Sequence, residues 1–146
     1  AVDAIPLDIL VGPGIVLDMR GKSVIDRASL EQSEAARYER ILLKTDNGSK
    51  LLEPAFTEDF VSLHADAAHY LVENRVRLIG IDYLSIEPYA ETSAPVHRIL
   101  LEAGVLIVEG ALLASVPAGP CRIYCLPLTL EGADGAPARL LVEMKG

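Results

Sequence analysis

The sequence predicts an α/β fold built on a mixed sheet, and three observations indicate this. Short apolar runs rich in β-branched residues alternate with segments in which apolar residues have helical spacing. Two of these runs, Leu78–Ile81 and Val105–Val108, are apolar almost throughout, which is typical of strands buried on both faces. Near the C-terminus two strand patterns flank a segment that contains Asp134-Gly135, a hairpin signal. A length of 146 residues, 51% of them hydrophobic, predicts a single domain over residues 1–146.

Local signals place the helices between these strands. Ser29 and Gln32 fit a capping box, so a helix is expected to start with Ser29 as its N-cap. Pro95 before a later apolar-periodic segment and Gly104 after it mark the start and end of another helix. The expected elements, in order, are strand Ile15–Met19, a helix to about Arg37, strand Arg40–Thr45, a turn at 45–49, helix Ala65–Asn74, strand Leu78–Ile81, helix Val96–Ala103, strand Val105–Val108, and strands near Ile123–Leu130 and Arg139–Val142.

The charge and the cysteines restrict the partners and the compartment. Thirteen basic and 21 acidic residues leave a net charge of −8, which repels nucleic acids and anionic membranes. The richest apolar stretch, Ile99–Val116, is interrupted by Glu102 and Glu109, so no transmembrane span is expected. Cys121 and Cys125 would lie about 13 Å apart along a strand, beyond disulfide reach. Reduced thiols and the lack of a secretory pattern predict a cytoplasmic location.

Two acidic residues close apolar strands, where ligands of α/β sheets usually bind. Asp82 follows Leu78–Ile81 and Glu109 follows Val105–Val108. His97 begins the helix before the second of these strands. The helix rises about 9 Å from His97 to its end, and the strand returns about 13 Å to Glu109, so the two side chains can share one site. The alternative is that each carboxylate only accepts hydrogen bonds from loop amides.

A histidine and a carboxylate suit a divalent metal such as zinc or manganese, although a catalytic zinc site needs three protein ligands. His64 and His69 are five residues apart, about 140° around a helix, and cannot chelate from one face. Ser85, with Asp82, is a candidate for binding substrate or a metal-bound water, or else it caps its loop. Arg98 would hold a carboxylate substrate or form a surface ion pair. The turn at 45–49 would cradle an anion or be an ordinary tight turn.

Several spaced motifs together carry a family resemblance. They are the strand and loop at 76–85, Pro95–Leu101, Val108–Gly110, Leu126–Leu128 and the segment Gly132–Arg139. Together they resemble the cyclase-like metal-dependent hydrolases, which include kynurenine formamidase (arylformamidase) and isatin hydrolase. The resemblance extends over nearly the whole chain.

The resemblance implies a swivelling β/β/α domain that hydrolyses a small-molecule amide or formamide with a metal-activated water. By motif match, His97 and Glu109 would be metal ligands, and Glu109 would also orient the water. The family's metal would be zinc or manganese, and the resemblance also implies a homo-oligomer.

One family motif, His-x-Gly-Thr-His-x-Asp-x-Pro, is expected upstream of the matching region. Residues 1–11 contain no histidine, and Ile5–Asp8 resembles the family's residues just downstream of that motif. The sequence is therefore interpreted as the C-terminal two-thirds of the family fold, with the metal site incomplete. Two hypotheses stay open. The chain is part of a hydrolase whose leading segment was cut away or lies on another chain, or it is a stand-alone remnant that binds a small molecule or oligomerises without catalysis.

Under either hypothesis, an unpaired sheet edge predicts a homo-oligomer, with exchanged strands as one form.

Overall fold

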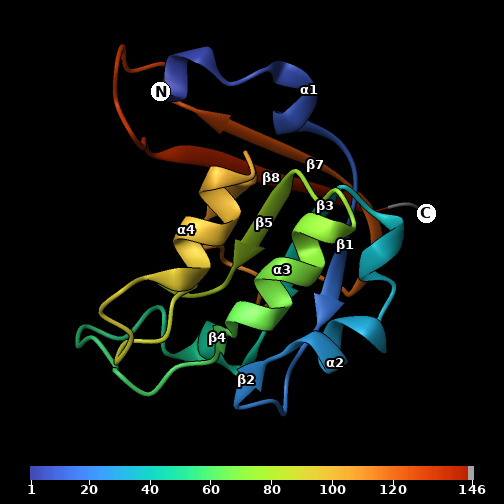
Figure 1. The fold of residues 1–146 in the computed structure, drawn as a ribbon, viewed down its shortest axis with the longest axis vertical. Coiled ribbons are helices and arrows are strands. Elements are labelled where there is room, and N and C mark those ends of the chain that lie inside the picture. The colour runs from blue at the N-terminus through green and yellow to red at the C-terminus, as the bar shows by residue number, and fades with distance from the viewer. Residues whose placement is uncertain (145–146) are drawn as a thin grey trace.

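The computed structural model describes residues 1–144, and its central element is a six-stranded mixed sheet. The strand order is β6-β5-β3-β1-β7-β8 (Figure 1). The first four strands are parallel to one another, β7 is antiparallel to β1, and β8 is antiparallel to β7. The prediction of a mixed α/β sheet is confirmed. The strands are β1 (Val11–Asp18), β3 (Arg40–Lys44), β5 (Leu78–Ile81), β6 (Leu106–Val108), β7 (Gly119–Pro127) and β8 (Ala138–Met144), with β2 (Val24–Ile25) and β4 (Ser62–Leu63) in a separate pair.

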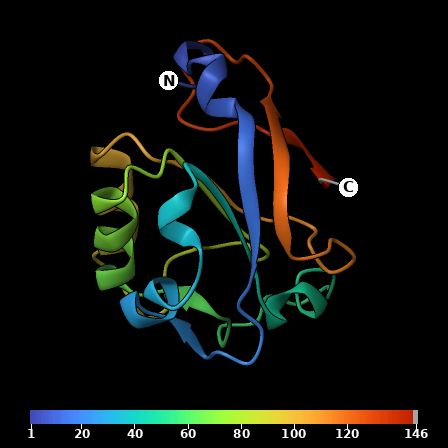
Figure 2. The same ribbon diagram turned by 90° about the vertical axis from the view of Figure 1, so that its right-hand side faces the viewer.

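Helices α2 (Arg27–Glu31), α3 (Ala65–Glu73) and α4 (Pro95–Glu102) cover one face of the sheet, as Figure 2 shows from the side. None of the helices described within residues 1–144 is long and apolar enough to cross a membrane. The helices are α1 (Leu7–Leu10), α2 (Arg27–Glu31), α3 (Ala65–Glu73) and α4 (Pro95–Glu102), with short 3-10 turns at Val2–Ala4, Ala35–Arg37 and Asp46–Ser49.

The core lies on both faces of the parallel strands because successive side chains of a strand point in opposite directions. Ile41 and Ile79 pack in the cluster that includes α3 and α4 residues such as Leu71 and Leu100. Leu42 and its neighbours on the other face pack against the loop after β6 and against inward-facing residues of β7. All of β3 and β5 is buried, which explains why β5 and the centre of β3, Ile41–Leu43, are apolar.

The first strand begins earlier than predicted. The Gly12-Pro13-Gly14 segment was expected to precede the strand, but it lies inside β1 and pairs with β7. A Cβ on Gly14 would lie 2.7 Å from the backbone oxygen of Arg40 and 2.5 Å from Cδ1 of Ile123. The glycine is therefore needed for close packing and not for a turn.

The cap predicted for the first helix was wrong. Asp26 is the N-cap of α2, because its Oδ1 accepts hydrogen bonds from the Ser29 backbone N at 2.9 Å and from the Ser29 hydroxyl at 2.5 Å. Ser29 therefore lies inside the helix, which ends at Glu31 and is followed by a separate 3-10 turn. The later helices agree closely with prediction, and Gly104 follows α4 with a φ of 75°.

The β7–β8 hairpin rises away from the layer of helices and forms a lobe with the N-terminal segment (Figure 2). The backbone N of Val2 donates to the Ala133 oxygen at 2.9 Å, which ties the N-terminal turn to the hairpin loop. β7 starts at Gly119, four residues before the predicted strand, because it pairs with β1 as well as with β8. β6 and β8 stand at the two ends of the strand order.

Candidate functional site

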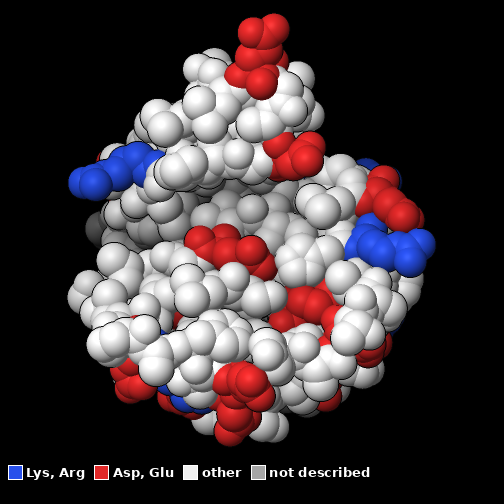
Figure 3. Space-filling view, turned by 90° about the vertical axis from the view of Figure 1, so that its left-hand side faces the viewer, with Lys and Arg blue, Asp and Glu red and all other residues white. Residues whose placement is uncertain are grey.

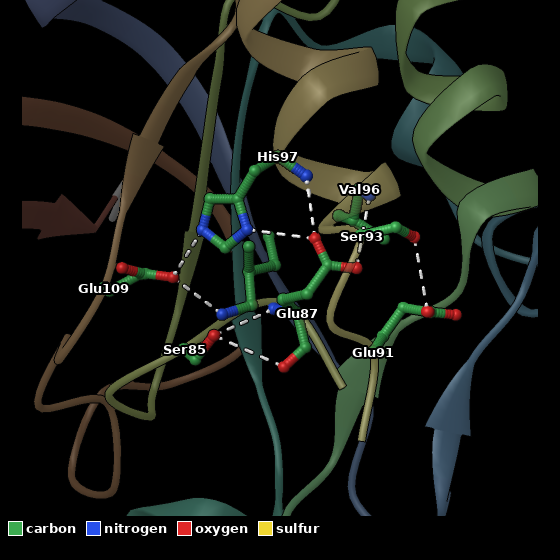
Figure 4. Close-up of polar contacts among 8 residues, drawn as sticks. Ser85, Glu87, Glu91, Ser93, Val96, His97 and Glu109 are labelled. Carbon is green, nitrogen blue, oxygen red and sulfur yellow. Dashed lines mark hydrogen bonds and ion pairs between the residues drawn. The ribbon is translucent and has the colours of Figure 1, made fainter. Parts of the chain in front are cut away.

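A histidine and two glutamates meet beside the C-terminal ends of β5 and β6. His97 is the third residue of α4, Glu109 follows β6, and Glu87 belongs to the loop between β5 and α4. The imidazole ring lies between the two carboxylates in Figure 4. This is the edge of the sheet where the sequence placed a candidate ligand site.

As predicted, the helix and the strand that connect His97 to Glu109 bring the two side chains together. Nε2 of His97 lies 3.2 Å from Oε1 of Glu109. Both side chains are partly accessible, at 29% and 32% exposure, so a small ligand can reach the pair. Glu109 is further held by the backbone N of Ile86, which donates to the same oxygen at 2.8 Å.

Glu87 is a member of this cluster that the sequence did not single out. Its Oε2 lies 3.0 Å from Nδ1 of His97, on the side of the ring opposite Glu109. The side chain is only 7% exposed. One signal could have revealed it: α4 starts after Ala94, which cannot cap a helix with its side chain, so another group had to satisfy the first backbone N–H donors.

Asp82 and Ser85 do not join the pair. Asp82 is fully buried, and its oxygens accept hydrogen bonds from the Thr45 backbone N at 2.8 Å and the Thr45 hydroxyl at 2.6 Å. Burial raises the pKa of the Asp82 carboxyl, and the hydrogen bonds from Thr45 partly offset this. The Ser85 hydroxyl receives a bond from the backbone N of Glu87 and donates to the Glu87 oxygen. Both side chains make the hydrogen bonds within the chain that the loop-stabilising alternative predicts.

The remaining polar candidates also have structural roles. His64 precedes α3 and contacts Asp66 at 2.8 Å, while His69 is exposed on the helix. Arg98 lies 3.8 Å from Glu102 in an exposed ion pair. The segment at 45–49 forms a 3-10 turn whose cap is the Thr45 side chain.

Cys121 and Cys125 are both buried in β7. Burial raises the pKa of the Cys125 thiol.

A cavity of about 380 Å³ lies next to Glu109. Its walls come from β6, the following loop, the β7–β8 hairpin and the N-terminal segment, and most of its lining is apolar. The hollow between the hairpin lobe and the rest of the molecule is visible in Figure 3, with acidic side chains nearby. The cavity therefore offers an organic molecule a chamber with both apolar and polar walls, in which Glu109 and Asp134 are the acidic residues.

The fit of a metal ion to these residues is partial. Nε2 of His97 and a Glu109 oxygen are donors that zinc and manganese accept, and they face one another. Glu87 cannot share the same ion because the imidazole ring separates it from Glu109. Within residues 1–144, no group of three or more His, Cys, Asp or Glu side chains is placed to hold a metal. The described residues thus supply two donors of a site and not a complete set.

The fold and this pair define a mixed α/β protein with a candidate ligand site at the carboxyl ends of its parallel strands. The chain belongs to the Cyclase family, whose model, described as putative cyclase, matches residues 1–88. His97 and Glu109 lie beyond that match but within the stretch shared with full-length relatives.

Curated relatives include two proteins named kynurenine formamidase. The one from Salinibacter ruber is 34% identical over 98% of this chain and 68% of its own length. The one from Bacillus cereus (strain ATCC 10987) is also 34% identical, over 94% of this chain and 65% of its own. Cyclase-like protein 1 of Arabidopsis thaliana is 36% identical over 96% of this chain and 56% of its own length. The chain thus spans about two thirds or less of the length of these relatives.

Solved structures agree with the family assignment. A potential metal-dependent hydrolase with cyclase activity superposes with a TM-score of 0.88 at 35% identity, covering 100% of this chain and 72% of that protein. A predicted metal-dependent hydrolase from Bacillus stearothermophilus has a TM-score of 0.84 at 37% identity, over 94% of this chain and 66% of that one. An isatin hydrolase bound to thioisatinate matches with a TM-score of 0.80 at 19% identity, over 99% and 64%, which shows a shared fold.

Proposed function

We propose that this chain carries two ligands, His97 and Glu109, of a divalent metal site in a hydrolase of small-molecule amides or formamides related to kynurenine formamidase. The observation that carries the proposal is the 3.2 Å approach of His97 Nε2 to Glu109 Oε1 beside a cavity of about 380 Å³. The metal would be zinc or manganese. The names of the relatives support the reaction class, and the names of the structural neighbours support metal dependence.

Each residue has a distinct role in this proposal. His97 offers a ring nitrogen to the cation, and Glu109 offers an oxygen that can also accept a hydrogen bond from water. A divalent metal bound there supplies a water of lowered pKa and polarises the substrate carbonyl. The cavity next to Glu109 receives the substrate, whose apolar part packs against the aliphatic residues of its wall.

A second candidate function arises from the incomplete ligand set among the described residues. In that case the chain binds a small molecule, or assembles with further copies, without turnover. The cavity of about 380 Å³ is large enough for a small organic ligand.

Metal content and hydrolysis discriminate between the two. If the first function holds for this chain by itself, purified protein incubated with zinc or manganese should retain the metal after desalting and hydrolyse an aryl formamide. His97→Ala and Glu109→Gln should each reduce the metal affinity and the hydrolysis rate by more than about 100-fold. Removing a group that only supports a metal ligand costs up to about 100-fold. The matched control is His69→Ala, an exposed histidine outside the site. Bound metal without turnover would favour the second function, and no metal retention by the unaltered protein would refute the metal site.

We further propose a cytoplasmic homo-oligomer without nucleic-acid or membrane partners. β8 ends the strand order, and an antiparallel pairing of two β8 strands about Leu141 would set Arg139 of each copy opposite Glu143 of the other. Leu141 is 48% exposed and would pack against its own counterpart on the axis. Light scattering should give a dimer or larger, and Leu141→Lys should shift it toward monomer. A monodisperse monomer at high concentration would overturn this proposal.

A further inference from the structure

We propose that Glu87 is the positioning residue of this site: its carboxylate holds the His97 ring as the Nδ1–H tautomer, with Nε2 directed toward Glu109. The inference deepens the proposed function and rests on it only for what Nε2 binds. The ring orientation itself is set by contacts within the chain.

The carboxylate of Glu87 receives three contacts from the start of α4. Its Oε1 accepts from the backbone N of Val96 at 3.2 Å. Its Oε2 accepts from the backbone N of His97 at 3.0 Å and lies 3.0 Å from Nδ1 of the same residue (Figure 4). With 7% of the side chain exposed, water competes little for these oxygens. One carboxylate therefore grips both the main chain and the ring of His97.

These contacts favour Nδ1 as the ring nitrogen that carries the proton. An ionised carboxylate only accepts hydrogen bonds, so Glu87 and Glu109 each favour an N–H on the ring nitrogen that faces them. Glu87 is the better placed acceptor, because its contact is shorter, at 3.0 Å against 3.2 Å, and its side chain is 7% exposed against 32% for Glu109. A neutral imidazole has a single N–H group, and placing it on Nδ1 leaves a lone pair on Nε2. That lone pair faces Oε1 of Glu109 at 3.2 Å, a pairing of two electron-rich atoms that a bound cation would make favourable.

Glu87 also replaces the missing cap of α4. The residue at the N-cap position, Ala94, has a φ of 48° and makes no side-chain cap bond. A carboxylate at this end satisfies orphan N–H groups and interacts favourably with the helix dipole. The orientation of His97 is thereby tied to the point at which the helix begins.

Neighbouring residues extend the same arrangement to Glu109. The Ser85 hydroxyl holds the backbone N and O of Glu87 at 3.1 and 3.3 Å. The backbone N of Ile86 donates to Glu109 at 2.8 Å. Three consecutive residues thus hold both members of the pair, which gives Ser85 an indirect role in the site.

The test compares Glu87→Gln with Glu102→Gln in metal-free protein. Gln retains a side-chain oxygen that can accept from the main chain of α4, but its amide N–H2 group would face Nδ1 as a donor. The neutral His97 ring should then change to the Nε2–H tautomer, which imidazole nitrogen chemical shifts report directly. Glu102 is an exposed carboxylate of the same helix, so Glu102→Gln should leave the tautomer unchanged.

Zinc affinity provides an independent readout. Calorimetry should show binding about 10–100-fold weaker in Glu87→Gln and unchanged in Glu102→Gln. Unaltered protein in which neutral His97 carries its proton on Nε2 would overturn the proposal, without requiring any variant to fold. An unchanged tautomer in folded Glu87→Gln would overturn it as well. If the tautomer follows Glu87 while zinc does not bind at all, the positioning role is supported and the metal-site proposal fails.

Discussion

Replacing Thr45 by valine should destabilise the protein in a pH-dependent way. The Thr45 hydroxyl donates to Asp82 Oδ1 at 2.6 Å and accepts from the backbone N of Asn47 at 3.0 Å. All three residues are buried, and Asp82 closes β5 directly before the loop that carries Glu87. Valine has nearly the same shape as threonine, so the substitution removes hydrogen bonds and creates little cavity.

The expected cost is about 3 kcal/mol near neutral pH. A hydrogen bond to a charged group contributes about 1.5–3 kcal/mol, and the buried N–H of Asn47 left without its acceptor costs about 1 kcal/mol more. For a chain of this size each kcal/mol lowers the melting temperature by about 2–4 °C. Thr45→Val should therefore melt about 6–12 °C below the unaltered protein.

The sign of the pH dependence is set by Asp82. Burial raises its folded-state pKa above the unfolded value, and the nearby Asp46 charge adds to this, while Thr45 opposes both. A raised pKa means that the stability contributed by this group is complete below the unfolded pKa and is lost as pH rises through the folded pKa. Removing the Thr45 hydroxyl raises the folded pKa further. The cost of Thr45→Val should consequently grow from about pH 4 to pH 8.

Chemical denaturation at several pH values measures this cost, with Thr92→Val as the control because Thr92 is exposed in a loop. The control should stay within about 0.5 kcal/mol of the unaltered protein at every pH. A Thr45→Val cost that is the same at pH 4 and pH 8, or as small as that of the control, would refute the assigned role of the Asp82 hydrogen bonds.

Two further predictions concern stability. Gly14→Ala should cost about 1–3 kcal/mol, because the new Cβ would lie 2.7 Å from a backbone oxygen that cannot move aside. Gly135→Ala, with open space around its Cβ, should be neutral or slightly stabilising, and equal costs in the two variants would contradict this explanation. Asp26→Ala should lose about 1 kcal/mol by removing the cap of α2, whereas Ser29→Ala should cost less if Asp26 is the cap. Both pairs can be compared by urea denaturation.

Much of the sheet was predictable from local patterns. β5 and the centre of β3, Ile41–Leu43, are apolar because they are buried on both faces, so they stand out without any knowledge of their neighbours. The boundaries of β1 and β7 were harder to predict. The residues before Ile15 and before Ile123 become strand because β1 and β7 pair with each other there. A Gly-Pro-Gly segment has the composition of a turn; pairing with β7 makes it a strand here, and the close approach of Arg40 explains why glycine is required.

The same division holds for the site. The sequence alone determined that His97 and Glu109 could lie at the same height along the antiparallel helix and strand. The reason is that the rise per residue is nearly constant in a helix and in a strand. The tertiary structure decided that Glu87 lies behind the ring and that Asp82 is turned inward to Thr45. Both depend on how an irregular loop packs against α4 and the turn after β3, and no local periodicity encodes such contacts.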